Sequence, residues 1–270
     1  MGRLDGKVAI VTGAGRLGNI GVAICEAFLR EGAKGIVATD FRTGERNDIA
    51  AHFGPAANGR LLQVEQDVTS PDDWDRVLAE AIGVFGQLDI LVNNAGISVH
   101  GGIADTALDD LRRVMAVNHD ALFLGIKTCA PLLADAYHRF PGGGSIINNL
   151  SMASFMPNAT NIGYHVSKSA GRMLTICAAL EFGPQKVRVN SVHPGVTMTP
   201  LIREGLEDYV RSGMWPSVEE AEAALAAMNP LGIASEPEDT ASAFVYLASE
   251  EARFVTGASI CHDGAIGLRY

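Results

Sequence analysis

The sequence predicts an α/β fold with a doubly wound, mostly parallel sheet of seven strands and helices on both faces. Apolar, β-branched runs alternate with helical patterns from one end of the chain to the other, which is typical of βαβ units. The strand candidates are almost continuously apolar, as expected of strands covered on both faces. The 270 residues, of which 47% are hydrophobic, suffice for one large core, so we expect a single domain over residues 1–270.

The expected elements follow one another without an internal repeat or a low-complexity linker. Each strand candidate is a short apolar run: KVAIVT at 7–12, GIVATD at 35–40, LLQVEQ at 61–66, DILVN at 89–93, SIINNL at 145–150, VRVNSVH at 187–193 and ASICH at 258–262. Helical patterns lie between them at 19–31, 43–53, 72–85, 106–139, 163–182 and 237–249.

The segment 197–236 breaks this alternation. An Ala/Glu-rich helical stretch follows its apolar first half, and the segment ends near the sequence NPLG. Ligands of such sheets bind beyond the carboxyl ends of the strands, so we expect a flap over the substrate pocket. A surface helical hairpin unconnected with substrate is the alternative. The apolar first half holds Met198, Pro200, Leu201, Ile202, Met214 and Trp215.

The charge of the chain argues against several kinds of partner. A formal net charge of −10, with no basic run, disfavours nucleic acid and anionic membrane surfaces. No stretch approaches the roughly 20 apolar residues that cross a bilayer, and no signal peptide opens the chain, so we expect a cytoplasmic protein. The seven histidines are scattered without metal-ligand spacing, so no metal site is expected.

The stretch VTGAGRLGNIG, residues 11–21, indicates a phosphate-binding loop. Gly13, Gly15 and Gly18 spell G-x-G-x-x-G directly after the first strand and before a helix. Backbone N–H groups and the helix N-terminus then face a pyrophosphate. Asp40, at the end of the second strand, is placed to accept hydrogen bonds from the adenosine ribose. Together they predict a Rossmann-like, dinucleotide-binding sheet.

Asp40 favours NAD over NADP, because a 2′-phosphate would meet its negative charge. Two arginines qualify this preference. Arg16 in the loop and Arg42 just beyond Asp40 are both placed to meet a 2′-phosphate if Asp40 turns away. The alternatives are a pyrophosphate contact for Arg16 and a solvated surface charge for either arginine.

The stretch GYHVSKSAG, residues 163–171, indicates acid/base chemistry. Tyr164 and Lys168 are one helical turn apart and share a helix face. An adjacent ammonium stabilises a phenolate, and lowering a phenol pKa by roughly three units corresponds to about 4 kcal/mol. Ser151, thirteen residues before the tyrosine, can hold a carbonyl or alcohol oxygen, and Ser154 is the alternative hydroxyl. His193, before Pro194, is interpreted as a structural residue at a strand end.

With these stretches, the chain resembles the compact short-chain dehydrogenases/reductases from about residue 4 to residue 266. The resemblance implies that Tyr164 is the general acid/base, that Lys168 binds the nicotinamide ribose and lowers the phenol pKa, and that Ser151 orients the substrate oxygen. It also implies that Asn118 helps to hold a proton-relay water. The implied cofactor contacts are Asp67 and Val68 at the adenine, Asn94, Ala95 and Gly96 at the adenosine half, and Pro194, Gly195, Val196, Thr197 and Thr199 at the nicotinamide.

The glycine loop departs from the family pattern T-G-x-x-x-G-x-G, which would place glycines at positions 17 and 19, where Leu17 and Asn19 stand. Treating both residues as insertions makes Gly18 and Gly21 the second and third glycines. The loop is then two residues longer than usual. We expect the amides of Gly18, Asn19 and Ile20 to contact the pyrophosphate.

The resemblance and the site residues predict an NAD-dependent oxidoreductase that interconverts a secondary alcohol and a ketone. The Met and Trp content of the flap, with Met152 and Pro157 near the serine, favours a hydrophobic cyclic or aromatic substrate, such as a steroid or terpenoid. The alternatives are an NADPH-dependent 3-oxoacyl-thioester reductase and a non-catalytic nucleotide-sensing protein. The resemblance also implies a homotetramer, with 106–139 and 163–182 at subunit contacts and the C-terminal GLRY tail reaching a neighbour.

Overall fold

The computed structural model describes residues 2–42, 49–57, 59–211, 213 and 215–268. Its seven-stranded sheet has the order β3-β2-β1-β4-β5-β6-β7, and every neighbouring pair is parallel. The predicted fold class is confirmed, and each predicted strand agrees with the structure to within one residue at either end. The strands are β1 Val8–Thr12, β2 Gly35–Asp40, β3 Leu61–Glu65, β4 Ile90–Asn93, β5 Gly144–Asn149, β6 Val187–Pro194 and β7 Ser259–His262.

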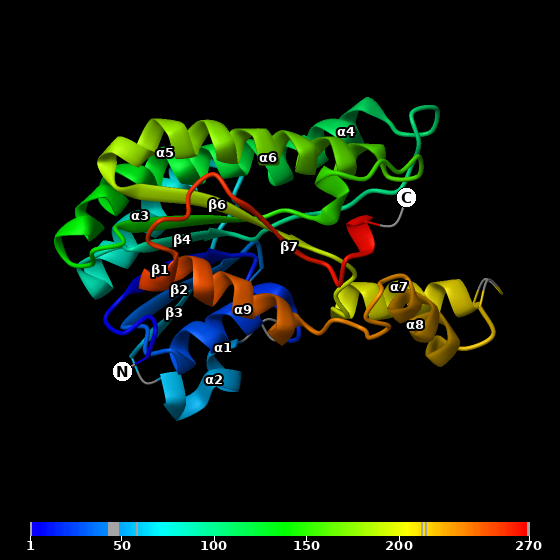
Figure 1. Cartoon of the computed structure of the whole chain (residues 1–270), viewed down its shortest axis with the longest axis horizontal. Coiled ribbons are helices and arrows are strands. Elements are labelled where there is room, and N and C mark those ends of the chain that lie inside the picture. Colours follow the sequence, from blue (N-terminus) through cyan, green and yellow to red (C-terminus); the bar gives the residue numbers. More distant parts are fainter. Residues whose placement is uncertain (1, 43–48, 58, 212, 214, 269–270) are drawn as a thin grey trace.

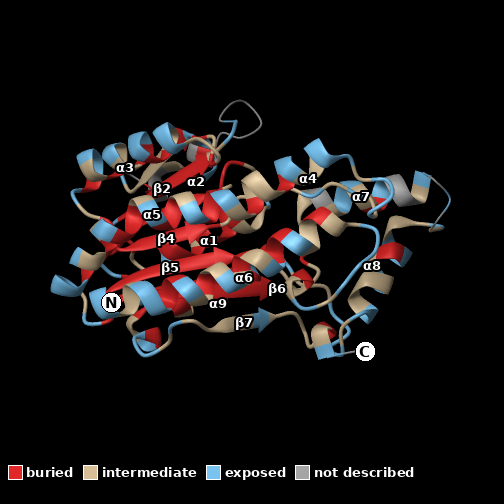
Figure 2. Cartoon of the chain, turned by 90° about the horizontal axis from the view of Figure 1, so that it is seen from above, coloured by how far each residue is buried: buried red, intermediate tan, exposed pale blue. Residues whose placement is uncertain are grey.

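Helices cover both faces of this sheet (Figure 1). One core packs α1 and α9 against one face, and a second core packs α3, α5 and α6 against the other. The central strands are buried throughout, as Figure 2 shows, which explains their continuously apolar sequences. The helices are α1 Ile20–Arg30, α2 Ile49–Ala57, α3 Pro71–Phe85, α4 Leu108–Met115, α5 Ala121–Ala134, α6 Ile162–Phe182, α7 Pro200–Arg211, α8 Val218–Ala227 and α9 Pro237–Ala248.

Two predicted helices differ from the structure. The stretch 106–139 is not one regular helix, because a π-helical segment, Ala116–Asp120, separates α4 from α5. A π-turn is difficult to predict from a pattern with a 3.6-residue period, and such turns are frequent at functional sites. In the stretch 43–53, residues 43–48 lie outside the described residues, and the described helix α2 extends to Ala57. The other predicted helices agree to within one residue at each end.

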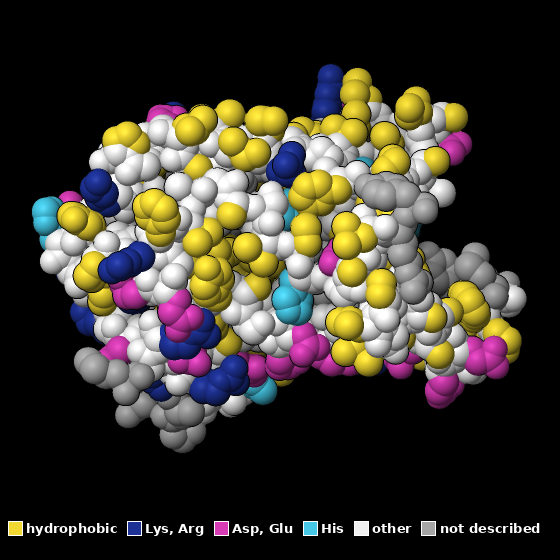
Figure 3. Space-filling view, in the orientation of Figure 1, with side chains coloured by type: hydrophobic (Ala, Val, Ile, Leu, Met, Phe, Trp, Pro, Cys, Tyr) yellow, Lys and Arg dark blue, Asp and Glu magenta, His cyan; other side chains and the backbone are white. Residues whose placement is uncertain are grey.

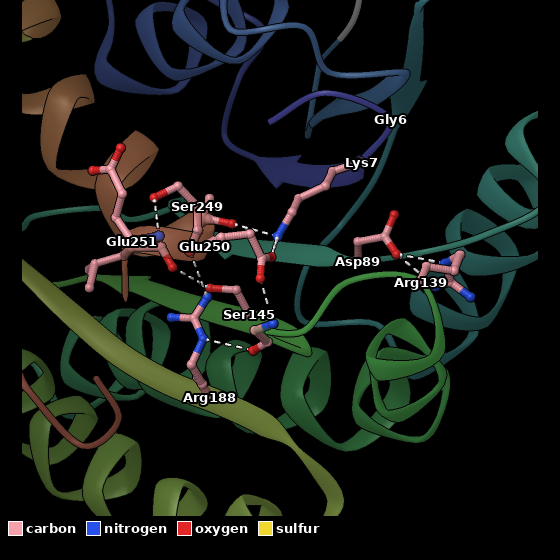
Figure 4. A network of polar contacts seen from close by, with 12 residues as sticks. Gly6, Lys7, Asp89, Arg139, Ser145, Arg188, Ser249, Glu250 and Glu251 are labelled. Carbon is pink, nitrogen blue, oxygen red and sulfur yellow. Dashed lines mark hydrogen bonds and ion pairs between the residues drawn. The ribbon is translucent and has the colours of Figure 1, made fainter. Parts of the chain in front are cut away.

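A buried polar network stabilises the amino ends of the strands (Figure 4). Lys7, only 2% exposed, donates to Glu250 Oε1 at 2.8 Å and to the carbonyl of Ala248 at 3.0 Å. Nearby, Arg139 and the fully buried Asp89 form an ion pair at 2.7 Å. These groups lie at the edge of the sheet opposite the glycine loop, so we interpret them as structural.

The carboxyl ends of the strands form the other edge. β1 lies between β2 and β4, so the chain leaves β1 in one direction and returns on its other side. Ligands of doubly wound sheets bind in the crevice beside such a reversal of strand order. In the space-filling view the molecule is hollowed between the projection that carries α4 and the one that carries α7 and α8 (Figure 3). None of the helices in the described ranges is long and apolar enough to span a membrane.

Candidate active site

The glycine loop connects β1 to α1 and ends in a helix cap. Asn19 is the N-cap: its Oδ1 accepts from the N–H of Val22 at 2.8 Å, and its Nδ2 donates to the carbonyl of Gly13 at 3.0 Å. A Cβ at Gly21 would lie 2.4 Å from the Gly13 carbonyl oxygen, so only glycine allows the helix to approach the strand end so closely. This packing is what the alignment with two inserted residues requires of Gly21.

Gly15 makes room for Asp40 rather than for the helix. A Cβ at Gly15 would lie 2.5 Å from the Cβ of Asp40, and the N–H of Gly15 donates to Asp40 Oδ2 at 2.9 Å. The loop therefore fixes this carboxylate at the end of β2. Of the three amides expected to contact a pyrophosphate, that of Asn19 donates to the Arg16 carbonyl at 3.2 Å within the loop.

A cavity of about 470 Å³ opens beside Asp40, at the ends of β2 and β3. Asp67 lies at its rim, and its Oδ1 accepts from the N–H and the hydroxyl of Thr69, which fixes the turn after β3. Val68, the next residue in the chain, is 9% exposed and belongs to the core that contains α3. The cavity is lined by Phe41, Arg42, Glu65, Asp67, Asp73 and Arg76.

The segment 94–96 joins three strand ends. Asn94 Nδ2 donates to the carbonyls of Thr12 at 2.9 Å and Gly13 at 3.0 Å, and its Oδ1 accepts from Asn149 Nδ2 at 2.7 Å. The N–H of Ala95 donates to the Thr12 hydroxyl at 3.1 Å. These bonds hold the glycine loop against β4 and β5, so Asn94 and Ala95 shape the cofactor crevice through their neighbours.

Ser151, Tyr164 and Lys168 lie together at the same edge. Lys168 is 4% exposed, and its Nζ donates to the carbonyl of Asn149, the last residue of β5, at 2.9 Å. The same nitrogen lies 5.5 Å from the ring centroid of Tyr164. Burial raises the pKa of the Tyr164 phenol, and a hydrogen-bonding interaction with the Ser151 side chain lowers this pKa in part. A Cβ at Gly96 would lie 3.5 Å from Lys168 Nζ, which places the segment after β4 against this group.

The expectation that Lys168 lowers the pKa of Tyr164 is wrong for this structure. Burial raises the pKa of the Tyr164 phenol above its ordinary value, and only the hydrogen bond with Ser151 counteracts the rise. Burial also lowers the pKa of Lys168 to about 8, so the charged form of each group is disfavoured. The ammonium is held by the Asn149 carbonyl and lies over the ring.

The two candidate serines have different partners. Ser151 caps a short 3₁₀ helix, Met152–Ser154, and its Oγ accepts from the N–H of Ala153 at 3.1 Å. Ser154 donates its hydroxyl to the carbonyl of Lys168 at 3.0 Å. The Ser154 hydroxyl therefore ties this turn to α6, whereas the Ser151 hydroxyl meets the phenol.

Asn118 lies in the π-helical segment and is 1% exposed. Its Oδ1 accepts from the N–H of Ile97 at 2.8 Å, and its Nδ2 donates to the carbonyl of Ile97 at 2.9 Å and to Ser167 Oγ at 3.1 Å. The side chain thus fixes the segment after Gly96 beside α6.

The segment after β6 leads into the expected flap. The N–H of Gly195 donates to the carbonyl of His262 at 3.0 Å. The hydroxyl of Thr197 lies 3.3 Å from that of Thr240 on α9, and Thr197 is 5% exposed, so this side chain is turned toward α9. Thr199 accepts weakly, at 3.5 Å, from the N–H of Ile202 at the start of α7. Pro194 ends β6, and Val196 packs against the small core of the flap.

The expected flap has its own small core. Met198, Leu206 and Ala221 are buried there, with Ile202 and Trp215 packed against them. Met198 and Trp215 therefore serve packing within this segment. Met214 and the side chain of Leu201 lie outside what the structure describes.

Two contacts connect this segment to the glycine loop. Arg16 forms an ion pair with Glu204 on α7, so this guanidinium is directed at the flap. A Cβ at Gly18 would lie 3.3 Å from Pro200 Cγ, at the start of the same helix. Glu204 could not be predicted as a partner of Arg16, because nothing in the sequence connects the two across 188 positions. Asn149 was not predicted as the partner of Lys168, although its place at a strand end two residues before Ser151 is a usable signal.

Comparison with known proteins identifies this arrangement. A family model described as enoyl-(acyl carrier protein) reductase matches residues 13–266. A Mycobacterium tuberculosis protein named 3-alpha-(or 20-beta)-hydroxysteroid dehydrogenase is 38% identical over 263 residues, which cover 97% of this chain and 90% of the relative. A crystal structure described as that of a short-chain dehydrogenase/reductase from Burkholderia xenovorans matches with a TM-score of 0.89 and 33% identity, over 100% of both chains. The chain belongs to the short-chain dehydrogenase/reductase family.

The predicted family is thereby confirmed, and so is the prediction of an oxidoreductase that acts on CH–OH groups with a nicotinamide cofactor. One relative has a cofactor in its name. A Lentilactobacillus kefiri relative, 35% identical over 268 residues that cover 97% of each chain, is named NADP-dependent (R)-specific alcohol dehydrogenase. Among the described residues, no group of His, Cys, Asp and Glu is placed to hold a metal ion.

Proposed function

We propose that this short-chain dehydrogenase/reductase is an NAD-dependent dehydrogenase that interconverts a hydrophobic cyclic secondary alcohol and its ketone. The observation that carries the proposal is the Ser151, Tyr164 and Lys168 group beside a glycine loop that opens onto Asp40. The bound nicotinamide supplies the hydride acceptor or donor. Side chains of this protein bind the cofactor, orient the substrate oxygen and exchange its proton.

The residues present suit a dinucleotide. The close approach at Gly21 brings the N-terminus of α1 to the strand edge, where a helix favours an anion. Gly18 and Ile20 would offer amides to the pyrophosphate. Asp67 lines the cavity expected to take the adenine, and Phe41, which lines the same cavity and is 61% exposed, offers a ring to stack on it. Lys168 would bind the nicotinamide ribose.

Tyr164 would exchange the proton of the substrate oxygen. Its phenol stays protonated at neutral pH because its pKa is raised, so a proton is available for ketone reduction. The Ser151 hydroxyl both orients the substrate oxygen and stabilises the phenolate needed for alcohol oxidation. Lys168, with a pKa of about 8, can pass a proton toward solvent near neutral pH. Asn118 holds the segment at Ile97 that closes this side of the site.

Asp40 supports NAD as the preferred cofactor. Its carboxylate is fixed by the Gly15 N–H at the end of β2, where the adenosine ribose is expected, and a 2′-phosphate would meet like charge. Arg16 supports the same conclusion, because its ion pair with Glu204 turns the guanidinium toward the flap.

The substrate class rests on the apolar surroundings and on the relatives. Phe155, in the turn after Ser151, is 39% exposed, and Met152 begins the same turn. The Mycobacterium relative is named as a steroid dehydrogenase, and a steroid is a rigid apolar ring system that such surfaces suit.

An activity assay tests the proposal. Purified protein is mixed with NAD or NADP and with each of a panel of cyclic alcohols, linear alcohols and sugars, and the absorbance of the reduced nicotinamide is followed. We expect turnover of cyclic alcohols with NAD, and a lower kcat/KM with NADP. Turnover of sugars alone would contradict the substrate class, and the lack of any turnover would favour a nucleotide-sensing binding protein.

A second function, on acyl thioesters, is suggested by the matching family model, whose description names an enoyl-(acyl carrier protein) reductase. An NADPH-dependent 3-oxoacyl-thioester reductase would use the same Ser151, Tyr164 and Lys168. The Asp40 carboxylate disfavours NADPH, because it would repel the 2′-phosphate. The net charge of −10 disfavours an acidic carrier protein. Acetoacetyl thioesters with NADPH in the same assay distinguish the two functions.

The assembly and location also remain proposals. We infer a homotetramer in the cytoplasm, with α5 and α6 at subunit contacts. Hydrophobic side chains gather over α6 in the space-filling view (Figure 3). The exposed apolar residues of α6 include Val166, Met173 and Leu180, and Phe123 is exposed on α5. Light scattering after gel filtration measures the molar mass, and a monomeric mass would contradict the inference.

A further inference from the structure

The hydrogen-bond ladder between β5 and β6 ends just before Ser151. Its last pair is Asn149 with Val192, and the N–H of Leu150 still donates to the carbonyl of Val192 at 2.8 Å. In a parallel pair, the next bond would come from the N–H of residue 194. That residue is Pro194, which has no N–H, so the backbone ladder cannot continue along the strand end that leads to Ser151.

At this point a hydrogen bond from the side chain of His193 takes the place of the missing backbone hydrogen bond. The imidazole is fully buried, its Nδ1 lies 2.9 Å from the carbonyl oxygen of Ser151, and its Nε2 lies 2.8 Å from Ser191 Oγ. A carbonyl oxygen only accepts, so Nδ1 carries the proton and donates to Ser151. Nε2 of the neutral ring then accepts from the Ser191 hydroxyl, which fixes this tautomer. The Phe155 ring packs on the imidazole with centroids 4.7 Å apart.

We propose that His193 is a positioning residue for catalysis: its neutral imidazole clamps the backbone of Ser151 and so keeps the serine hydroxyl on the Tyr164 phenol. The proposal rests on the proposed roles of Ser151 and Tyr164. Without the clamp, Ser151 is held by its own short turn, through the N–H groups of Ala153 and Ser154. A serine that moves away no longer orients the substrate oxygen and no longer stabilises the phenolate.

The surroundings keep His193 neutral. Burial, together with the cationic side chains of Lys168 and Arg172 on α6, lowers the pKa of His193 to about 4, and the bond to Ser151 and the carboxylate of Asp263 after β7 oppose this only in part. The tautomer described above is therefore the form present at neutral pH. This explains why a histidine can serve as a fixed donor here rather than as a proton carrier.

Two variants separate the clamp from simple packing. In His193→Asn, the amide nitrogen stands near the position of Nδ1 and can still donate to the Ser151 carbonyl, whereas His193→Leu has no donor. We expect His193→Leu to lower kcat for alcohol oxidation about tenfold to a hundredfold, the loss typical of a small misplacement of a reacting group. The dissociation constant for NAD should stay nearly unchanged. His193→Asn should recover most of kcat.

The pH profile gives a readout that packing alone would not move. In His193→Leu the rise of kcat/KM with pH should shift to higher pH, because the Ser151 hydrogen bond no longer counteracts the raised pKa of Tyr164. A variant with a lower melting temperature but the wild-type kcat and pH profile would overturn the proposal, and so would equal losses in the Asn and Leu variants.

Nitrogen NMR of the wild-type protein tests the clamp without any substitution. We expect the signal of His193, assigned by its loss in His193→Asn, to show a proton on Nδ1 from pH 6 to pH 9 (roughly the range in which the ring is neutral). If His193→Asn fails to fold, comparison with Ser191→Ala makes the assignment. A proton on Nε2 would overturn the proposal. This measurement needs no turnover, so it distinguishes failure of the clamp from failure of the proposed dehydrogenase activity.

Discussion

The ammonium nitrogen of Lys168 lies over the ring of Tyr164, 5.5 Å from the ring centroid, and donates to the carbonyl of Asn149 at 2.9 Å. Helix α6 places Lys168 beside Tyr164, and the last residue of β5 accepts its hydrogen bond. The position of the lysine side chain is therefore fixed by β5 as well as by α6. Lys168 is buried and Tyr164 is half-buried, and the loss of water around them disfavours the charged form of each group. Tyr164 and Lys168 are therefore suited to transferring a proton, because neither is stable in its charged form.

Replacing Tyr164 with Phe removes the only group proposed to exchange a proton with the substrate. We expect kcat to fall by about 10²- to 10⁴-fold, the usual contribution of general acid/base catalysis, while the dissociation constant for NAD changes little. Steady-state kinetics and fluorescence titration with NADH measure the two effects. Tyr137→Phe, at an exposed tyrosine after α5, is the matched control and should keep full activity. Substantial activity in Tyr164→Phe would refute the acid/base role.

Replacing Ser151 with Ala should change the pH dependence as well as the rate. The serine hydrogen bond is what counteracts the burial-raised pKa of Tyr164, so its loss raises that pKa further. Alcohol oxidation needs the phenolate, and its kcat/KM should then rise only at higher pH than in the wild type. Ser154→Ala is the control, because its hydroxyl bonds the Lys168 carbonyl instead. A larger profile shift in the Ser154 variant would mean that the serine roles are reversed.

Asp40 allows charge to be separated from hydrogen bonding. Asp40→Asn removes the negative charge and retains an oxygen for the Gly15 N–H, whereas Asp40→Ala removes both. We expect the ratio of kcat/KM for NADP to that for NAD to rise about tenfold in the Asn variant, which corresponds to about 1.4 kcal/mol of lost repulsion. An unchanged ratio in both variants would show that this carboxylate does not contribute to the discrimination between NAD and NADP.

Local patterns account for what could be predicted from the sequence. The strands agree to within one residue because each is a short, mostly apolar run between polar or turn residues. The spacing of Tyr164 and Lys168 follows from helix geometry alone. Even the longer glycine loop could be interpreted by asking which glycine a close approach requires. That glycine is Gly21, whose absent Cβ leaves room for the Gly13 carbonyl.

The features that could not be predicted from the sequence depend on residues that only the folded chain brings together. The role of Gly15 in making room for Asp40, the ion pair of Arg16 with Glu204 and the bond from His193 to Ser151 each join distant positions. The direction of the Tyr164 pKa shift could not be predicted, because it depends on how deeply α6 is buried. The π-helical segment at Asn118 has no counterpart in a pattern based on regular helices.

The ion pair between Arg16 and Glu204 is expected to slow cofactor release. It joins the glycine loop to α7, and a Cβ at Gly18 would lie 3.3 Å from Pro200 Cγ beside it, so any movement of α7 away from the loop must break this ion pair. Both side chains are substantially exposed, so the pair contributes at most about 1 kcal/mol, or about fivefold in a rate. Glu204→Gln should therefore raise the NADH dissociation rate by up to that factor in stopped-flow fluorescence.

Glu207→Gln, on the exposed part of the same helix, controls for the change in net charge and should leave the NADH dissociation rate as it is. The difference between the two variants should also vanish at high salt, because exposed pairs are screened. A release rate that does not change in Glu204→Gln at low salt would mean that α7 does not limit cofactor exchange.

Lys168 is expected to destabilise the fold below pH 8. Its pKa is about 8 in the folded chain against an ordinary value of 10.5, so between these values the unfolded chain binds the extra proton. Stability then rises with pH across this window, by at most about 3 kcal/mol from this one group. Urea unfolding at pH 7.5, 8.5 and 9.5 (values chosen roughly to span the window) should show the rise in the wild type. Lys168→Met should lack that part of it, and parallel pH dependences would show that the lysine is not buried as a charge.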